Sequence, residues 1–351
     1  MKNVIAVIWD CDKTLIDGYM QDPMFAEYGV ETKQFWADEN KILDEYQKTG
    51  VRVNRDTYYL NYFIKCAHEG IFPGLNNAKL RSFGKLQKLY PGTLEFFRKT
   101  KNMFRNDASY SEYDIQVEHY IVSTGFAEVI RGMELMNYVD DVWGCELMEA
   151  PDADNQPLIN EIVYTIDNTT KTRAIFEINK GIGKIDGIDV NSKIPQELRR
   201  VKFENMIYIA DGPSDIPAFS LVHQNGGSTF AIYPKGDVAA MKQVEQMRAD
   251  GRVDMYAEAD YSENTTANMW ITNRIQELAD KTFYNPAYFS RLFKRCYGKT
   301  VTEYMQEKRV QEASRLLIDT DLPIEEICHK VGYSDKGTFY GIFKAHQALT
   351  P

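Results

Sequence analysis

The stretch VIAVIWDCDKT, residues 4–14, decides the fold of the first part of the chain. Residues 4–9 are apolar and mostly β-branched or aromatic, which predicts a strand buried on both faces of a parallel sheet. Asp10 and Asp12 follow, so two carboxylates stand at the carboxyl end of this strand. Such a pair can cap the next helix, or it can belong to a site, because open parallel sheets bind ligands at this edge.

Three further apolar runs predict strands, at residues 115–122, 206–210 and 229–233. Long helical patterns separate them, which predicts an α/β sheet with helical crossovers. Residues 15–95 contain no convincing strand, and Pro91-Gly92 marks a turn into a new helix. We therefore expect a helical insertion directly after the first strand.

More polar residues follow the later strands. The second predicted strand ends in YIVSTG, which places Ser123 at its tip and Gly125 at the start of a helix. The third ends in MIYIADGPSD, which places Asp211 and Asp215 at its tip. Four acidic residues that converge at one sheet edge need a cation, and oxygen-only ligands favour Mg²⁺. The sequence therefore predicts a magnesium site.

At these positions the sequence resembles the haloacid dehalogenase-like hydrolases. The D-x-D-x-T motif, the serine at a strand end, the lysine that opens a helix and the D-x-x-x-D signature occur in the family's order over roughly residues 1–265. The matching residues are Asp10, Asp12, Thr14, Ser123, Lys171, Asp211 and Asp215. Because dehalogenases of this family lack the second aspartate, the resemblance favours phosphatases, and among them the phosphoserine-phosphatase-like branch.

The resemblance implies a role for each catalytic candidate. Asp10 would attack phosphorus and form an aspartyl-phosphate. Asp12 would protonate the leaving oxygen and later deprotonate the attacking water. Ser123 would hold phosphate oxygens, and Lys171 would offset the charge of the nucleophile and the phosphoryl group.

The resemblance also implies the ligands of the cofactor and the phosphate. Mg²⁺ would be bound by Asp10, the main-chain carbonyl of Asp12, Asp211 and Asp215. The cofactor and phosphate end of the site would be completed by Thr14, Thr124 and Gly125, the last through backbone N–H groups at a helix N-terminus. The insertion over about residues 15–95 would be the family's cap, which closes over the site.

Aromatic residues in this insertion have two interpretations. Tyr58, Tyr59, Tyr62 and Phe63 are spaced as the buried face of a helix, which favours the core of the cap. The alternative is a cage around the substrate. The identity of the substrate, a small phosphorylated metabolite, does not follow from the sequence.

The last 80 residues differ in charge and pattern from the rest. Residues 272–351 hold 12 Lys and Arg and 10 Asp and Glu, a net charge of +2, whereas residues 1–271 carry −12. Two similar units follow each other, LADKTFYNPAYFSRLFK and ICHKVGYSDKGTFYGIFK, each typical of a helix-turn-helix. This stretch resembles the DNA-binding domain of the arabinose-regulator (AraC) family.

That resemblance implies double-stranded DNA as a partner. The candidate DNA-binding residues are Ser290, Arg291, Lys294 and Arg295 on the first recognition helix, and Lys336, Thr338 and Tyr340 on the second. The second unit departs from the family pattern at Gly341, where an arginine is common. We therefore expect the first helix to contribute most of the affinity.

Together these patterns predict an α/β fold with a Rossmann-like parallel sheet and a helical cap insertion, followed by a small all-α double helix-turn-helix domain. The expected domains are residues 1–270 and 271–351. Five scattered Cys, no membrane-length apolar stretch and no signal-peptide pattern predict a cytoplasmic location. The oligomeric state stays open.

Three hypotheses about function remain at this point. The first is a Mg²⁺-dependent phosphomonoester hydrolase with a DNA-binding appendage. The second is a transcriptional regulator whose phosphatase-like domain senses a phosphorylated ligand. The third is a gene fusion of little functional consequence. Every catalytic position is present, and a pure sensor would not require this, so we favour the first.

Overall fold

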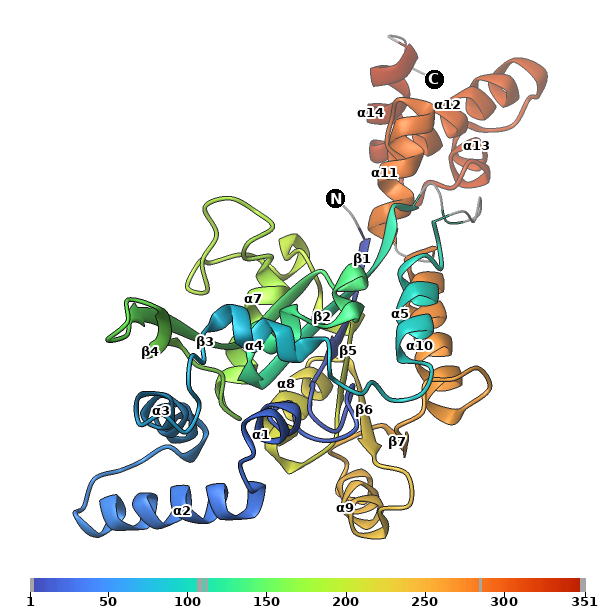
Figure 1. Ribbon diagram of the computed structural model, residues 1–351. Helices are drawn as coiled ribbons and strands as arrows, with labels where there is room; N and C mark the ends of the chain where they lie inside the picture. The colour runs from blue at the N-terminus through green and yellow to red at the C-terminus, as the bar shows by residue number, and fades with distance from the viewer. Residues whose placement is uncertain (1–2, 106–109, 111–112, 284–285, 348–351) are drawn as a thin grey trace. The chain divides into compact units, whose positions relative to one another are not determined.

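The computed structural model describes residues 3–105, 110, 113–283 and 286–347 of the 351-residue chain (Figure 1). The chain forms two compact units, Met1–Ala279 and Asp280–Pro351. Among the described residues no helix combines the length and the apolar character needed to cross a membrane.

A seven-stranded sheet is the centre of the first unit. Its strands are β1 (Asn3–Trp9), β2 (Ile115–Phe126), β3 (Asp141–Pro151), β4 (Pro157–Tyr164), β5 (Met206–Ala210), β6 (Ser228–Tyr233) and β7 (Met255–Glu258). They lie in the order β4-β3-β2-β1-β5-β6-β7. Only β3 and β4 pair antiparallel among these strands, and the other pairs are parallel.

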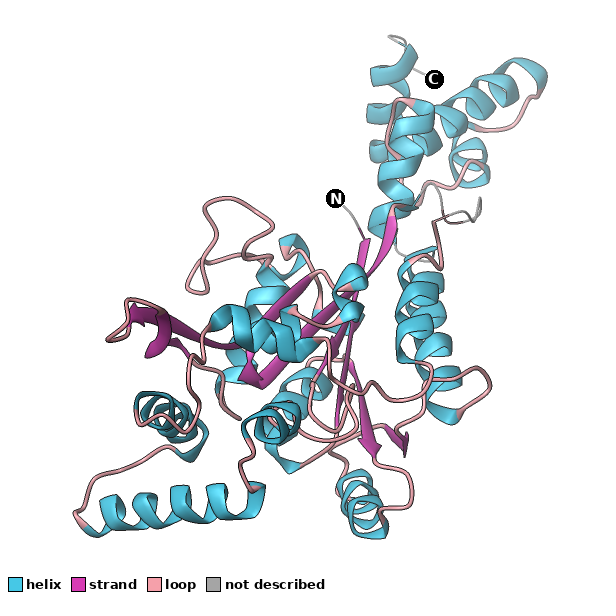
Figure 2. Ribbon diagram, viewed as in Figure 1, coloured by secondary structure: helices cyan, strands magenta, loops and turns pink. Residues whose placement is uncertain are grey.

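Helices fill most of the remaining chain, as Figure 2 shows. Those between β1 and β2 are α1 (Asp22–Tyr28), α2 (Thr32–Lys48), α3 (Arg55–His68), α4 (Asn77–Gly84) and α5 (Thr93–Lys101). The others of the first unit are α6 (Ala127–Arg131), α7 (Thr170–Lys180), α8 (Ile216–Gln224), α9 (Val238–Ala249) and α10 (Thr266–Phe283), which runs past the division between the units. The second unit adds α11 (Pro286–Tyr297), α12 (Val301–Asp319), α13 (Ile324–Lys330) and α14 (Lys336–Gln347).

The predicted fold class is confirmed: a mostly parallel α/β sheet with a helical insertion, then a helical region. All four predicted strands are present as β1, β2, β5 and β6. The prediction missed β3, β4 and β7. β3 and β4 mix apolar with polar residues and pair with each other with register shifts, and β7 has only four residues, so none shows a long apolar run.

Strand β1 has both faces buried, as its continuous apolar pattern predicted. Alternate residues belong to two separate cores: Ile5, Val7 and Trp9 to one, and Val4, Ala6 and Ile8 to the other. Helices α5 and α10 contribute to the first core, whereas α7, α8 and α9 contribute to the second. The sheet is therefore the middle layer of three.

The insertion builds its own aromatic core. The ring of Phe63 lies 5.3 Å from that of Phe72 and 4.9 Å from that of Phe35, measured between centroids. The edge strand β4 also joins this part, since the Ile159 N–H donates to the Leu75 carbonyl at 3.0 Å. Offset ring packing of this kind stabilises a small helical layer.

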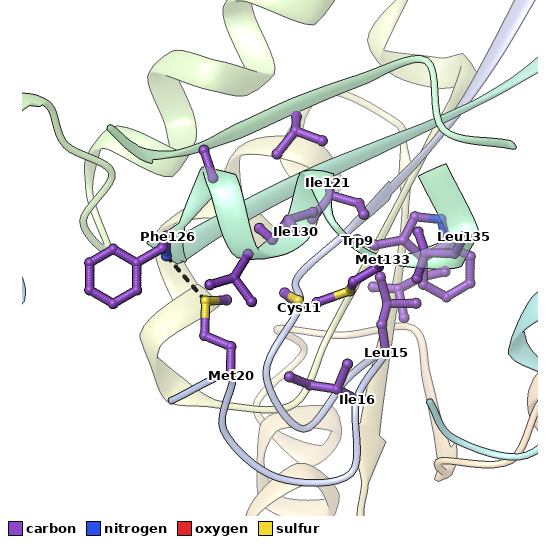
Figure 3. Close-up of a cluster of buried hydrophobic side chains, with 14 of the residues drawn as sticks. Trp9, Cys11, Leu15, Ile16, Met20, Ile121, Phe126, Ile130, Met133 and Leu135 are labelled. Carbon is purple, nitrogen blue, oxygen red and sulfur yellow. Dashed lines mark hydrogen bonds between the residues drawn. The ribbon is translucent and has the colours of Figure 1, made fainter. Parts of the chain in front are cut away.

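The loop between β1 and α1 is held by its apolar residues. Figure 3 shows the cluster of buried side chains around it. Its labelled members are Trp9, Cys11, Leu15, Ile16, Met20, Ile121, Phe126, Ile130, Met133 and Leu135. The Phe126 N–H also donates to Met20 Sδ at 3.1 Å. Because these anchors alternate with Asp10, Asp12 and Thr14, the cluster fixes the backbone that carries the candidate site.

The second unit has a small core of its own. Its buried residues come from α12, the α13–α14 pair and the turn between them: Val310, Ala313, Ile327, Cys328, Val331, Tyr333, Phe339 and Phe343. Thr300 and Glu303 form a capping box at the start of α12. The Thr338 N–H donates to Asp335 Oδ1 at 2.8 Å and so caps α14. Helices α13 and α14 thus form one helix-turn-helix.

The turn before α5 generates a stability prediction. Gly92 has φ +76°, and a Cβ there would lie 2.2 Å from the backbone nitrogen of Ser262. Gly50 has φ +83°, but a Cβ added there would meet no atom within 4 Å, so it isolates the cost of the left-handed backbone. We expect Gly50→Ala to cost about 1–2 kcal/mol of unfolding free energy, and Gly92→Ala a further ~1–3 kcal/mol from the clash.

Denaturant unfolding of both variants measures this difference. Equal losses of stability in Gly92→Ala and Gly50→Ala would contradict the close approach of this turn to Ser262.

Candidate active site

The candidate site lies where β1 and β5 end side by side. The two strands pair in parallel up to Trp9 and Ile209, and the Asp10 N–H donates to the Ile209 carbonyl at 2.9 Å. Asp10 follows β1 and Asp211 follows β5, so the parallel pairing brings both carboxylates to one edge. This is the convergence that the sequence predicted.

Lys171 connects the acidic residues. It is the second residue of α7, and its Nζ donates to Asp10 Oδ1 at 2.7 Å and to Asp215 Oδ1 at 2.6 Å. The lysine is 1% exposed and Asp215 is fully buried. Burial alone lowers the pKa of Lys171, but the two carboxylates outweigh it and raise the pKa above its usual value. The ammonium is therefore charged throughout the physiological range.

Asp215 is fixed by two further donors. The Tyr208 hydroxyl donates to Oδ1 at 2.6 Å, and the Ser214 hydroxyl donates to Oδ2 at 2.9 Å. Because each carboxylate oxygen accepts about two hydrogen bonds, Lys171 and Tyr208 occupy Oδ1 and one position remains on Oδ2. Asp215 can thus position Lys171 and still offer one oxygen to a metal or a water.

Asp12 points away from this triad. Its Oδ1 accepts a hydrogen bond from the Met20 N–H at 3.0 Å, so its carboxylate faces the loop that leads into the insertion. Burial, followed by the charge of Asp10, raises the pKa of Asp12 well above its usual value. A raised carboxyl pKa favours the protonated form, which is the form that a general acid needs.

The pKa values of Asp10 and Asp211 are also raised. Burial raises the pKa of Asp10 to about 6, despite the nearby Lys171. Burial and then the charge of Asp10 raise the pKa of Asp211 to about 7. Ionising all of these carboxyl groups at once would place more negative charge at this edge than one lysine neutralises.

The donor set fits a magnesium ion. Asp10, Asp211 and Asp215 each offer a carboxylate oxygen, and these oxygens lie within 4.8 Å of one another. All donors are hard oxygen atoms, which suits Mg²⁺. The side chain of Asp12 does not belong to this group.

Ser123 and its neighbours differ from the expected strand-to-helix turn. β2 continues through Phe126, where it pairs with Cys145 of β3, and α6 starts only at Ala127 and has five residues. The expectation that Gly125 begins a helix is therefore wrong, since the helix begins two residues later. The unforeseen strand β3 is the reason: its pairing with β2 is interrupted after Val122 and resumes at Phe126, so residues 123–125 form an irregular stretch within the strand.

The residues themselves still lie at the site edge. Ser123 is two residues beyond the last β1–β2 pair, Trp9 with Ile121, and its Oγ accepts from the Gly125 N–H at 3.1 Å. Thr124 and Gly125 line a pocket together with Asp12. Thr14 is buried, and its Oγ1 makes no hydrogen bond to the part of the chain that the structure describes.

The candidate DNA-binding residues lie on two helices of the second unit. Ser290, Lys294 and Arg295 are exposed on α11, whereas the side chain of Arg291 lies outside the described residues. On α14, Lys336 and Thr338 are exposed and Tyr340 is half-buried. Lys336 pairs with Glu325 at 3.1 Å, so its charge is partly offset.

Sequence reasoning missed several residues around the site. Tyr208 lies inside β5 and appeared as a core residue, yet it holds Asp215. The aromatic pattern favours Tyr59 as part of the core of the cap. Its hydroxyl instead donates to the Thr124 carbonyl at 2.6 Å, and the residue lines the same pocket as Asp12. A polar atom within an otherwise apolar pattern was the available signal in both cases.

Different known proteins match different parts of the chain. A family model described as a helix-turn-helix domain matches residues 278–351. A probable transcription factor, PqrA of Proteus vulgaris, is 36% identical over 78 residues, which are 22% of this chain and 64% of that protein. A solved structure titled as a phospho-aspartyl intermediate analogue of phosphoserine phosphatase is 18% identical, covering 78% of this chain and 99% of that one, with a TM-score of 0.43.

An uncharacterized protein of Borreliella burgdorferi matches over a much longer stretch. It is 31% identical over 288 residues, which are 78% of this chain and 97% of that protein. The sheet order, the helical insertion after β1 and the acidic edge are features that the sequence resemblance to haloacid dehalogenase-like hydrolases predicts. By this identity and coverage the chain belongs to the same family as the Borreliella protein, and it carries a helix-turn-helix domain at its end.

Proposed function

We propose that the protein is a Mg²⁺-dependent phosphomonoester hydrolase that works through an aspartyl-phosphate on Asp10, with a DNA-binding C-terminal domain. The observation that carries this proposal is the buried Lys171 bound to both Asp10 and Asp215, beside an Asp12 whose pKa burial raises well above its usual value. A nucleophile, a fixed positive charge and a general acid thus lie at one sheet edge.

In the first step a carboxylate oxygen of Asp10 attacks phosphorus, and the bond from phosphorus to the ester oxygen breaks. Asp12 gives its proton to that oxygen, so an alcohol leaves. Lys171 holds Asp10 in place and offsets the negative charge. Asp10, Asp211, Asp215 and the Asp12 carbonyl would hold Mg²⁺, which supplies charge neutralisation for the phosphoryl oxygens when bound.

In the second step a water attacks the phosphorus of the aspartyl-phosphate. Asp12, now ionised, takes a proton from this water, and the bond from phosphorus to Asp10 breaks. Inorganic phosphate leaves, and both aspartates return to their starting states. Ser123, Thr124 and Gly125 are proposed to bind the phosphate oxygens at the end of β2.

The helix-turn-helix domain supports an alternative role. Its match to a family model implies DNA binding, so the first unit could report a bound phosphorylated ligand to the second. In that case hydrolysis would be slow or absent, and the phosphorylated ligand would change DNA affinity instead.

The first chemical prediction concerns Asp10. Asp10→Asn should lower kcat for phosphomonoesters on the order of 10³-fold or more, because an amide is no nucleophile and only binding contributions remain. Asp186→Asn, an exposed aspartate in the loop after α7, serves as the matched control and should keep full activity. Substantial Mg²⁺-dependent turnover by a folded Asp10→Asn protein would refute the mechanism.

The acid role of Asp12 predicts a dependence on the leaving group. Asp12→Asn should lose roughly 10²–10⁴-fold on alkyl phosphates, whose leaving oxygen needs a proton. Activated aryl phosphates need little protonation and should lose less. Steady-state kinetics with both ester types measures the difference, and equal losses would count against Asp12 as the acid.

The raised pKa values predict how pH and metal affect stability. The pKa of Asp10 rises from 3.8 to about 6 and that of Asp211 from 3.8 to about 7. The metal-free folded protein therefore binds more protons than the unfolded chain, and it loses stability as pH rises from about 4 to about 7. Bound Mg²⁺ should offset this loss, contributing about 2.7 kcal/mol at one hundred times its Kd. The Mg²⁺-induced rise in Tm should thus be larger at pH 8 than at pH 5.5.

Thermal melts in EDTA and in Mg²⁺ test this. Asp211→Asn should lose most of the Mg²⁺ effect and become less dependent on pH in EDTA. An identical Tm with and without millimolar Mg²⁺ at pH 8 would exclude a metal site of this kind.

For the second unit, DNA binding should depend on α11. Replacing Lys294 and Arg295 by alanine in the full chain should weaken binding to duplex DNA and reduce the salt slope by about 0.9 for each phosphate that is no longer bound. Lys308→Ala on α12 is the control, since Lys308 lies on another helix. Fluorescence anisotropy at several salt concentrations measures both, and an unchanged slope would mean that α11 does not bind phosphates.

A further inference from the structure

A pocket extends from the candidate acid into the insertion. It measures about 260 Å³, which is small beside the roughly 300–1,000 Å³ of sites for drug-sized ligands. Asp12, Thr124 and Gly125 line it from the sheet edge. From the insertion it is lined by Tyr19, Gln21, Trp36, Glu39, Arg55, Asp56 and Tyr59. Because Asp12 faces the leaving oxygen in the proposed reaction, this pocket is where the leaving group would lie.

Two polar side chains of this pocket are buried. Glu39 is 5% exposed and Gln21 is 6% exposed. Within residues 3–105, 110, 113–283 and 286–347, neither the Glu39 carboxylate nor the Gln21 amide makes a hydrogen bond or an ion pair. Neither group is among the fully buried polar atoms without a partner, so both reach the open space of the pocket, where a bound ligand would meet them.

Arg55 also lines the pocket, but it forms no ion pair with Glu39. Arg55 donates to Asn40 Oδ1 at 2.7 Å and lies 3.8 Å from Asp44, so its guanidinium is engaged elsewhere. Burial raises the pKa of Glu39, and Arg55 only partly opposes this. A positively charged ligand group beside Glu39 would stabilise its ionised form.

The remaining lining also favours a cation. Trp36 and Tyr59 both line the pocket, with ring centroids 6.4 Å apart and planes inclined by 56°. Aromatic faces attract organic cations, including quaternary ammonium groups. Asp12 and Asp56 add two more carboxyl groups to the lining, to which Arg55 contributes one positive charge.

From this arrangement we infer that the substrate is a phosphomonoester whose leaving alcohol carries an alkylammonium group, bound by the Glu39 carboxylate, the Gln21 amide oxygen and the rings of Trp36 and Tyr59. The inference rests on the proposed hydrolase function and adds the class of substrate. The reaction is unchanged: the bond from phosphorus to the ester oxygen breaks, Asp12 protonates that oxygen, and an amino alcohol or its N-methylated form leaves.

The test compares esters that differ only in charge. Phosphocholine carries a quaternary ammonium, and 3,3-dimethylbutyl phosphate replaces its nitrogen by carbon with nearly the same shape. Phosphoethanolamine tests a primary ammonium. We expect kcat/KM for at least one cationic ester to exceed that of the neutral ester roughly 10- to 100-fold in the full chain with Mg²⁺, as a charged hydrogen-bonded contact would provide.

Glu39→Gln then identifies the residue. The substitution keeps the shape of the side chain but removes its charge, so the ratio of kcat/KM for the cationic over the neutral ester should fall toward one. Glu45→Gln, an exposed position on the same helix α2, is the matched control and should leave this ratio as in the wild type. Tm values of both variants verify that they are folded.

Each outcome separates this inference from the function on which it rests. Equal hydrolysis of charged and neutral esters would overturn the cationic leaving group while supporting the hydrolase. A preference for cationic esters that persists in Glu39→Gln would overturn the role of Glu39. Failure to hydrolyse any ester, the activated aryl phosphate included, would overturn the hydrolase and this inference with it.

Discussion

The ammonium group of Lys171, buried between Asp10 and Asp215, is the interaction on which the site depends. A charged side chain with 1% exposure is tolerated only when opposite charges and hydrogen bonds surround it, because its desolvation costs several kcal/mol. Its partners come from the end of β1 and from the turn after β5, and Lys171 itself comes from α7. Three segments far apart in sequence must therefore be placed correctly before this charge can be buried.

This arrangement leaves the sheet edge short of positive charge. Four aspartates lie near one another, and the one buried lysine among them does not prevent the pKa values of Asp10, Asp12 and Asp211 from rising. A site that is destabilised when empty gains stability from a cation or a phosphorylated ligand. The apolar anchors of residues 11–20 and the hydrogen bonds to Asp215 hold the carboxylates together despite their repulsion.

The insertion connects the chemistry to the choice of substrate. Its helices α2 and α3 supply Glu39, Trp36 and Tyr59 to a pocket that Asp12 also lines. The aromatic pattern of α3 predicted a helical core, and Tyr62 and Phe63 are indeed buried. Tyr59 lies on the same helix but reaches the Thr124 carbonyl instead. A helical pattern identifies the buried face, but which buried residue meets the pocket depends on what packs against it.

The fold class, four of the strands and the candidate residues of the acidic edge follow from the amino-acid sequence, because the apolar run of β1 and the strand-end acids are local patterns. The continuation of β2 past Ser123 depends on tertiary structure, since strand β3 pairs with it again at Phe126 after an irregular stretch. The tertiary structure also decided that Tyr208 holds Asp215 and that Glu39 and Gln21 line one pocket with Asp12. Partners and cavities of this kind arise between segments distant in the chain, and no local periodicity encodes which of them meet.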